Sequence, residues 1–513
     1  MEEAANKRRA GGGRRGRGGA GERKVAPAPA YVERQIPYFD FLSTDQVEAI
    51  LAEVNWMLEV KGIEFRDNPG ALARLKDAGA DVDGCCVRFP DGMARKLAQT
   101  CPAEFTQHAR NPDRTVKIGG RNQVFASMYG APFVRDAGGE RRYGSMKDFN
   151  QLAKILHMLP HVHHLGHVIC EPVDVPVNKR HLDMVYSLMS NSDKPFLGAI
   201  TEKERAQDSV NMARILFGEE RMERDTVIMG NVNTNSPLMI DKVASEAIEV
   251  YCGAGQGIVV VPFILSGAMG PVSTAASVAQ AIAEGLSCAA YSQIIRPGAP
   301  FILGNFLSSM SLKSGAPTFG MPEPVMSNYA IGQIARHLKL PLRCGGSLSA
   351  SKVPDAQAAA ESADSMHSTA LAGANFVLHA AGWLEGGLVM SYEKLVIDAD
   401  RLGMYARMLG GLATDENGLA RSAYEEVDHA GHFLGSAHTM ANYETAFYES
   451  PLSDSESFEQ WKEGGSKDME QRAYAYWNKL LAEHRVTPID PAIDEELKAY
   501  MAKTKEALPD QAY

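Results

Sequence analysis

The chain has 513 residues, of which 52 are Lys or Arg and 63 are Asp or Glu, so its formal net charge is -11 at pH 7. This acidic balance argues against general nucleic-acid binding by the folded body. No apolar stretch reaches the roughly 18–20 uncharged residues of a transmembrane helix. The 7 cysteines are scattered and form neither a disulfide framework nor a zinc motif. We therefore expect a protein of the reducing cytoplasm without a membrane partner.

The first residues differ from the rest of the chain. Residues 6–24 read NKRRAGGGRRGRGGAGERK, which is rich in Gly and Arg and has no apolar run. Such a composition cannot bury enough surface to fold, so residues 1–30 are predicted to be a disordered basic tail. Two interpretations remain open: an electrostatic arm for RNA, an acidic partner or a membrane surface, and a solvated tail without a site.

Residues 31–114 are predicted to form an N-terminal helical region. Ser43 is followed by apolar residues at helical spacing up to Leu58, which is typical of an N-cap and an amphipathic helix. A second short helix is expected to stop at Gly79.

From residue 115 to 395 short apolar runs alternate with helical segments. The runs interpreted as strands are 124–130, 167–170, 195–201, 226–233, 257–263, 300–306, 341–346 and 376–382. Eight such repeats predict an α/β fold, a closed (β/α)8 TIM barrel. An open doubly wound sheet is the alternative, but no G-x-G-x-x-G follows the first strand. Residues 396–513 are predicted to be a C-terminal helical extension.

The carboxyl ends of barrel strands are where an active site is expected. Here these ends carry an imidazole, amides, glycines and a tyrosine, while Lys and Arg are nearly absent: Tyr129, Asn231, Asn305, Gly345, Gly346 and His379. Backbone N–H groups around Gly345 and Gly346 are candidates for holding an anion such as a carboxylate.

Aromatic residues lie near the same strand ends. Phe125 and Tyr129 are expected on one face of the first strand, and Trp383 follows the last strand. Phe306 and Phe319 flank the loop after the sixth strand. Rings around a cation-poor cavity can hold a quaternary ammonium by cation–π attraction, although core packing explains such residues equally well.

Other chemistries have weaker support. There is no G-x-S-x-G and no H-E-x-x-H, and Cys344 has no activating neighbour in sequence. His429, His432 and His438 share one turn-rich segment and are either structural or within reach of a metal. A metal-dependent TIM-barrel lyase or hydrolase using these histidines therefore stays an alternative, as does a non-enzymatic binding protein that uses the basic tail.

Four separated motifs carry a resemblance to a known family: MGNVNTNSPL, GGSLSASKVPDAQAAAES, FVLHAAGWLEGGLVMSYEKLVIDAD and GHFLGSAHT. Together they resemble the trimethylamine methyltransferase family over about residues 35 to 500. The resemblance implies a (β/α)8 barrel that moves a methyl group from a methylated amine to the cobalt of a separate corrinoid protein. The family archetype carries pyrrolysine, whereas this chain has only standard residues, as in the branch resembling glycine betaine:corrinoid methyltransferases.

The resemblance also implies partners and roles. When a quaternary amine loses a methyl group, the tertiary amine that remains is neutral. Co(I) can therefore take the methyl group by in-line displacement, without an acid or a tightly bound metal. His379 is then expected at the barrel mouth as the catalytic residue, Tyr129 and Asn231 beside the substrate, and Gly345 and Gly346 near a carboxylate. Phe125, Asn305 and Trp383 are further substrate-binding candidates by position alone. The corrinoid or cobalamin belongs to a cognate partner protein, and the family favours an assembly of identical subunits. Proline betaine, carnitine and trimethylamine remain alternative substrates.

Overall fold

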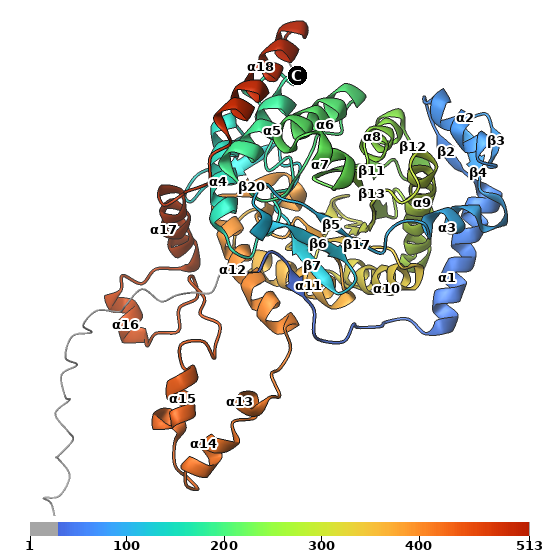
Figure 1. Ribbon diagram of the computed structural model, residues 1–513. Coiled ribbons are helices and arrows are strands. Elements are labelled where there is room, and N and C mark those ends of the chain that lie inside the picture. The colour runs from blue at the N-terminus through green and yellow to red at the C-terminus, as the bar shows by residue number, and fades with distance from the viewer. Residues whose placement is uncertain (1–28, 512–513) are drawn as a thin grey trace, which may run out of the picture.

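The computed structural model describes residues 29–511 (Figure 1). The predicted disordered tail therefore lies almost wholly outside the described residues. No helix in the described range is both long and apolar enough to cross a membrane.

The centre of the molecule is a twelve-stranded sheet whose middle strands all run parallel. In hydrogen-bonded order these strands are β10 (Phe196–Leu197), β11 (Ile228–Thr234), β13 (Gly257–Ser266), β14 (Phe301–Gly304), β17 (Leu342–Gly345), β18 (Phe376–Leu378) and β7 (Asn122–Phe125). Seven of the eight predicted runs thus contain a strand, and the last of them pairs with the first.

The predicted closed barrel is not confirmed, because the strand order is an open path from β10 to β5 (Glu104–Gln107) and is not closed into a ring. The predicted strand at 167–170 does not form. The chain just before it lies between β7 and β10. It is held there by one parallel bridge, Ala126 to His164, and by a few backbone hydrogen bonds on either side. Gly166 in this segment has φ +70°, a left-handed conformation that interrupts a ladder.

Helices surround these strands (Figure 1). They are α4 (Met146–Met158), α5 (Arg180–Asn191), α6 (Lys203–Phe217), α7 (Glu219–Arg224), α8 (Lys242–Gly253), α9 (Thr274–Ile295), α10 (Pro322–Leu338), α11 (Ala356–Ala372) and α12 (Tyr392–Leu409). Most follow one strand and precede the next, so the alternation of short apolar runs and helical segments predicted the element order correctly.

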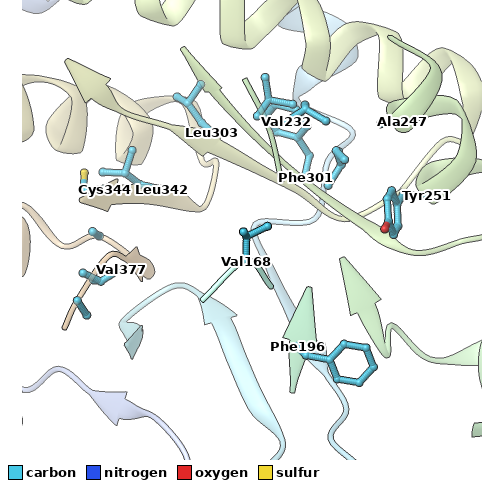
Figure 2. Close-up of a cluster of buried hydrophobic side chains, with 14 of the residues drawn as sticks. Val168, Phe196, Val232, Ala247, Tyr251, Phe301, Leu303, Leu342, Cys344 and Val377 are labelled. Atoms are coloured by element: carbon cyan, nitrogen blue, oxygen red, sulfur yellow. The ribbon is translucent and has the colours of Figure 1, made fainter. Parts of the chain in front are cut away.

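Alternate strand residues divide the core into two parts. One small cluster contains Met229, Val261, Ile302 and Leu378 from one face of the strands. Their neighbours in sequence belong to the large cluster that packs under the helices. Figure 2 shows part of that large cluster, which includes Val232, Phe301 and Leu303 from the strands and Ala247 and Tyr251 from α8.

The N-terminal region is less helical than predicted. It contains α1 (Thr44–Trp56), a π-helical turn (Met57–Lys61), α2 (Pro69–Asp77) and α3 (Met93–Ala98), with short 3-10 turns at Pro90–Gly92 and Pro112–Arg114. Ser43 caps α1 as predicted, accepting a hydrogen bond from the backbone N–H of Gln46. The strands that were missed are β1 (Val32–Glu33), β2 (Ile63–Phe65), β3 (Asp81–Asp83), β4 (Cys86–Arg88), β5 and β6 (Val116–Gly119). Each has two to four residues, too few to show a period of two in the sequence.

Other short strands extend the central sheet or form two smaller sheets beside it. β15 (Phe306–Met310) continues beyond β14, pairs with β13 and turns back through β16 (Pro317–Thr318). A separate small sheet joins β19 (Trp383–Leu384) and β20 (Val389–Ser391) to β8 (Phe133–Arg135) and β9 (Arg142–Tyr143). β12 (Met239–Ile240) pairs with β2. A 3-10 turn at Glu385–Gly387 links β19 to β20.

The C-terminal region is helical, as predicted. It comprises α13 (Glu416–Leu419), α14 (Arg421–Glu426), α15 (Ala437–Asn442), α16 (Phe458–Glu463), α17 (Met469–Ala482) and α18 (Pro491–Ala507), with a 3-10 turn at Phe433–Gly435. The short helices α13 to α16 lie away from the helices around the sheet (Figure 1). By contrast, α17 packs on α12 and α4, and α18 packs on α6.

Candidate active site

Four rings meet just beyond the carboxyl ends of β14 and β18, and we call them the aromatic group: Phe306, Phe319, His379 and Trp383. The imidazole of His379 lies 4.6 Å from the Trp383 ring and 5.2 Å from the Phe306 ring, centroid to centroid. Trp383 is also 5.8 Å from Phe306 and 5.6 Å from Phe319, edge to face in both cases. The indole N–H of Trp383 is buried and has no hydrogen-bond partner among residues 29–511. The structure thus brings two of the predicted site residues, His379 and Trp383, into one group with Phe306 and Phe319.

His379 reaches this group through an unusual backbone. Its φ is +61°, a left-handed value that is costly for a residue with a side chain. Its N–H donates to the carbonyl of Ser127, and the next N–H, of Ala380, donates to the carbonyl of Ala126. Here the backbone leaves the ladder of β18 and turns, and the imidazole side chain follows that turn into the aromatic group.

The His379 imidazole is held neutral. Its Nδ1 lies 2.8 Å from Nη2 of Arg343, and since a guanidinium only donates, Nδ1 must accept and carries no proton. Burial, followed by the positive charge of Arg343, keeps the pKa of His379 well below its ordinary value. A hydrogen bond to the backbone of Tyr129 opposes this shift without reversing it. At neutral pH His379 therefore cannot serve as a proton donor with its Nδ1 atom, and its catalytic role stays a prediction.

Arg343 was missed by the sequence reasoning, which described the strand ends as poor in cations. It lies within β17 between Leu342 and Cys344, and it is 1 % exposed. Nη1 donates to the carbonyl of Asn305 at 2.9 Å, and the guanidinium carbon lies 5.0 Å from the centre of the Phe306 ring. Within the described part of the chain, its Nε has no hydrogen-bond partner. The signal available in the sequence was an arginine inside an otherwise apolar strand.

Tyr129, in the loop after β7, and Asn231, within β11, interact through a side-chain hydrogen bond. Burial is the main cause of a raised pKa at the Tyr129 hydroxyl, with Glu171 adding to it, and a hydrogen bond from the Asn231 side chain works against the shift. Asn231 is buried, and its side-chain oxygen has no partner. Because the Tyr129 backbone also contacts His379, the tyrosine joins this polar pair to the aromatic group. An unpaired buried oxygen is a candidate contact for a ligand.

Gly345 and Gly346 have packing reasons for lacking a side chain. A Cβ on Gly346 would lie 2.4 Å from the Cα of Ala380, and one on Gly345 would lie 2.7 Å from a methyl group of Leu348. The N–H groups of Gly346 and Ser347 already donate to the carbonyls of Leu378 and His379. The backbone donors expected to hold a carboxylate are therefore in use, and substrate contact by the two glycines stays a prediction.

Asn305 and Phe125 point elsewhere. The Asn305 amide donates to Asn328 of α10, and its oxygen accepts from the backbone of Leu307. Phe125 stacks on His163 at 5.2 Å. It does not share a strand face with Tyr129, because β7 ends at Phe125 and Tyr129 follows in a loop. Their roles in substrate binding stay predictions.

Cavities lie beside this site. One of about 50 Å³ is lined by Tyr129, His167, Glu171 and Thr201. A larger cavity of about 570 Å³ lies between α11, α12 and the start of α17, lined by Asp355, Lys394 and Asp398 among others, and no member of the aromatic group lines it. Buried polar atoms that have no partner within residues 29–511 gather at the strand ends, at Asn231, Arg343 and Trp383.

The segment that contains His429, His432 and His438 shows no metal site. His438 is half-buried, and its Nε2 interacts with the carbonyl of Asn417. Across residues 29–511, no three His, Cys, Asp or Glu side chains are grouped so that they could hold a metal ion. Nothing in this part of the chain favours a metal-dependent lyase or hydrolase.

Comparison with known proteins decides the family. The profile described as trimethylamine methyltransferase (MTTB) matches residues 8–509. The chain belongs to this family. It is 38% identical over 469 residues to a glycine betaine methyltransferase of Desulfitobacterium hafniense (strain Y51), covering 91% of this chain and 98% of that protein.

More distant relatives carry other names. The trimethylamine methyltransferase MttB of Desulfitobacterium hafniense (strain DSM 10664 / DCB-2) is 26% identical, covering 90% of this chain and 94% of that protein. Among solved structures, the monomethylamine methyltransferase (MtmB) of Methanosarcina barkeri matches with a TM-score of 0.51 and 13% identity, covering 88% of this chain and 89% of that one. At this identity the likeness concerns the fold alone.

Proposed function

We propose that this member of the trimethylamine methyltransferase family is an enzyme that removes a methyl group from a quaternary amine of the glycine betaine kind. The observation that carries the proposal is the aromatic group, in a chain 38% identical to a glycine betaine methyltransferase. The acceptor we propose is the Co(I) centre of a separate corrinoid protein. The seven cysteines are all free, which supports a reducing, cytoplasmic location.

Rings suit a quaternary ammonium because such a cation has no N–H to donate. Its positive charge is spread over methyl groups, and these contact the negative faces of aromatic rings. Each ring contributes about 0.5–2 kcal/mol, with the larger values where water is excluded. Trp383 and Phe319 are almost fully buried, so a cation in contact with these rings would be largely desolvated.

The proposed transfer is an in-line displacement. The bond between the methyl carbon and nitrogen breaks, its electron pair stays on nitrogen, and a neutral tertiary amine leaves. The cobalt supplies the electron pair for the new bond to the methyl carbon. This chain's residues would bind and orient the amine and exclude water. No proton has to be moved, which agrees with an imidazole at His379 that stays neutral.

The proposed site also fits a barrel. We propose that the parallel strands form a (β/α)8-type barrel whose ladder is interrupted between β7 and β10. The pairing of β18 with β7 supports this, together with the bridge from Ala126 to His164. The aromatic group then lies at the carboxyl ends of the strands, where barrel enzymes hold their substrates.

A methyl-transfer assay with reduced cobalamin tests the function. Glycine betaine, proline betaine, carnitine and trimethylamine are supplied separately, and methylcobalamin is followed by its absorbance. We expect product from a quaternary amine and none from trimethylamine. Reaction with trimethylamine alone would refute the assigned substrate class, and no reaction with any of them, even with a cognate corrinoid protein, would refute the function.

Matched variants connect the activity to the rings. F306L removes a ring of the aromatic group, whereas F447L makes the same change at a side chain that is 84 % exposed. We expect F306L to raise KM for the quaternary amine and F447L to leave it unchanged. Equal kinetics in the two variants would exclude Phe306 from the site.

A further inference from the structure

Arg343 is a buried cation without an anionic partner. It is 1 % exposed and forms no ion pair with any carboxylate in the described part of the chain. The acidic group that acts on its charge is the thiol of Cys344, which is itself buried and has a raised pKa. Proteins seldom bury a charge without a partner, because the lost hydration is not replaced.

Only part of the hydrogen-bonding capacity of this guanidinium is used. One nitrogen donates to the carbonyl of Asn305 and a second to Nδ1 of His379, both of them neutral acceptors. The third nitrogen, Nε, is buried and has no partner among the residues that the structure describes. An arginine has five N–H donors in a planar fork that matches two carboxylate oxygens. The geometry leaves donors for an anion that the protein does not itself provide.

The surroundings place this unpaired cation beside the aromatic group. Phe306 contacts the guanidinium at 5.0 Å through its ring, and His379 contacts both Arg343 and the Trp383 ring. The His379 side chain thus lies between the Arg343 guanidinium, which suits a carboxylate, and the Trp383 ring, which suits a quaternary ammonium. A ligand that uses both must carry its negative and positive groups only a few bonds apart.

We propose that Arg343 binds the carboxylate of the substrate while the aromatic group holds its quaternary ammonium, so that the substrate is a short zwitterion with both groups on one carbon. This rests on the proposed function and deepens it. It assigns the carboxylate to a side chain and not to the backbone of Gly345 and Gly346, whose neighbouring N–H groups are already in use. A cation without a carboxylate, such as choline, would meet the charge of Arg343 unscreened.

Ligand binding without turnover tests this proposal. Calorimetry on the wild-type chain compares glycine betaine with its methyl ester and with choline, which keep the quaternary ammonium but lack the negative charge. We expect glycine betaine to bind at least about 30-fold more tightly than either, which is the lower range for a buried charge pair. Equal affinities would overturn the proposal without any variant having to fold.

Variants then assign the effect to one residue. R343Q is expected to lose that preference, R343K to keep part of it, and R224Q, at an exposed arginine, to keep all of it. Because the readout is a ratio of two ligands on the same sample, a smaller folded fraction does not change it. A preference in R343Q equal to that of wild type would overturn the proposal.

The same samples separate this proposal from the proposed function. If glycine betaine binds through Arg343 and yet no methyl group reaches Co(I), the transfer reaction is refuted and the binding site stands. If methyl transfer occurs but R343Q still prefers glycine betaine to choline, the function stands and the role of Arg343 is refuted.

Discussion

Trp383 offers the sharpest test of the aromatic group. Replacing it by leucine removes the ring that lies 4.6 Å from His379 and 5.8 Å from Phe306, and leaves an apolar side chain in its place. If the ring contacts the ammonium, the loss is one cation–π interaction of about 0.5–2 kcal/mol, or roughly 2- to 30-fold in affinity. Packing changes also weaken binding, so affinity for the amine alone does not isolate the charge.

A neutral isostere of the ammonium group isolates the contribution of its positive charge. In 3,3-dimethylbutanoate a carbon replaces the quaternary nitrogen of glycine betaine, so the shape and the carboxylate are kept and the positive charge is lost. We expect W383L to reduce the preference for glycine betaine over this isostere by roughly 2- to 30-fold. W56L, at a tryptophan that is 50 % exposed, serves as the matched control. Calorimetric titrations in which W383L keeps the full preference would refute contact between Trp383 and the ammonium.

Three further predictions concern charge and packing. Because His379 stays neutral, methyl transfer should show no inflection that depends on this residue between about pH 6 and pH 8. If the rate of methyl transfer showed an inflection near the ordinary pKa of histidine, and if that inflection disappeared in H379Q, the neutral state of His379 would be contradicted. Burial lowers the pKa of His164 and of His167 to about 3, so unfolded chains bind protons that the folded protein does not. The contribution of these two histidines to the free energy of unfolding is fully present above about pH 6.5 and falls by roughly 3 kcal/mol per pH unit below it. A flat profile of this free energy in urea titrations down to about pH 5 would argue against burial of the two imidazoles. G346A places a Cβ against the backbone of Ala380 and should lower the free energy of unfolding by about 1–3 kcal/mol. G253A is the matched control, because a Cβ at that position meets free space. Equal denaturant midpoints for the two variants would refute the close approach of Gly346 to Ala380.

The order of strands and helices was accessible from sequence because buried parallel strands read as continuous apolar runs. The runs at 257–263 and 341–346 became β13 and β17, and Ser43 caps its helix through a local hydrogen bond. The strand expected at 167–170 did not form, because Gly166 takes a left-handed conformation. Only a few backbone hydrogen bonds connect the neighbouring residues to the sheet. An apolar run shows that a segment is buried, not that it joins a ladder.

The site was partly accessible for a related reason. His379 follows β18 directly and Trp383 comes four residues later, at the start of β19, so their position along the chain pointed to a shared place at the strand end. Asn305 failed to join them, because its side chain turns toward Asn328 of α10, and no local pattern encodes that contact. Arg343 was overlooked because arginines are usually exposed, and its burial depends on acceptors brought by other strands. Side-chain direction at a strand end is a tertiary property.

The central claim is that a methyl group leaves a quaternary amine and reaches cobalt. The most direct measurement supplies glycine betaine with labelled methyl carbons to the full chain and Co(I) cobalamin, and quantifies both products. The account predicts labelled methylcobalamin and dimethylglycine in equal amounts, with no formation of either in the absence of the chain. Dimethylglycine without labelled methylcobalamin, or binding of glycine betaine without either product, would contradict it.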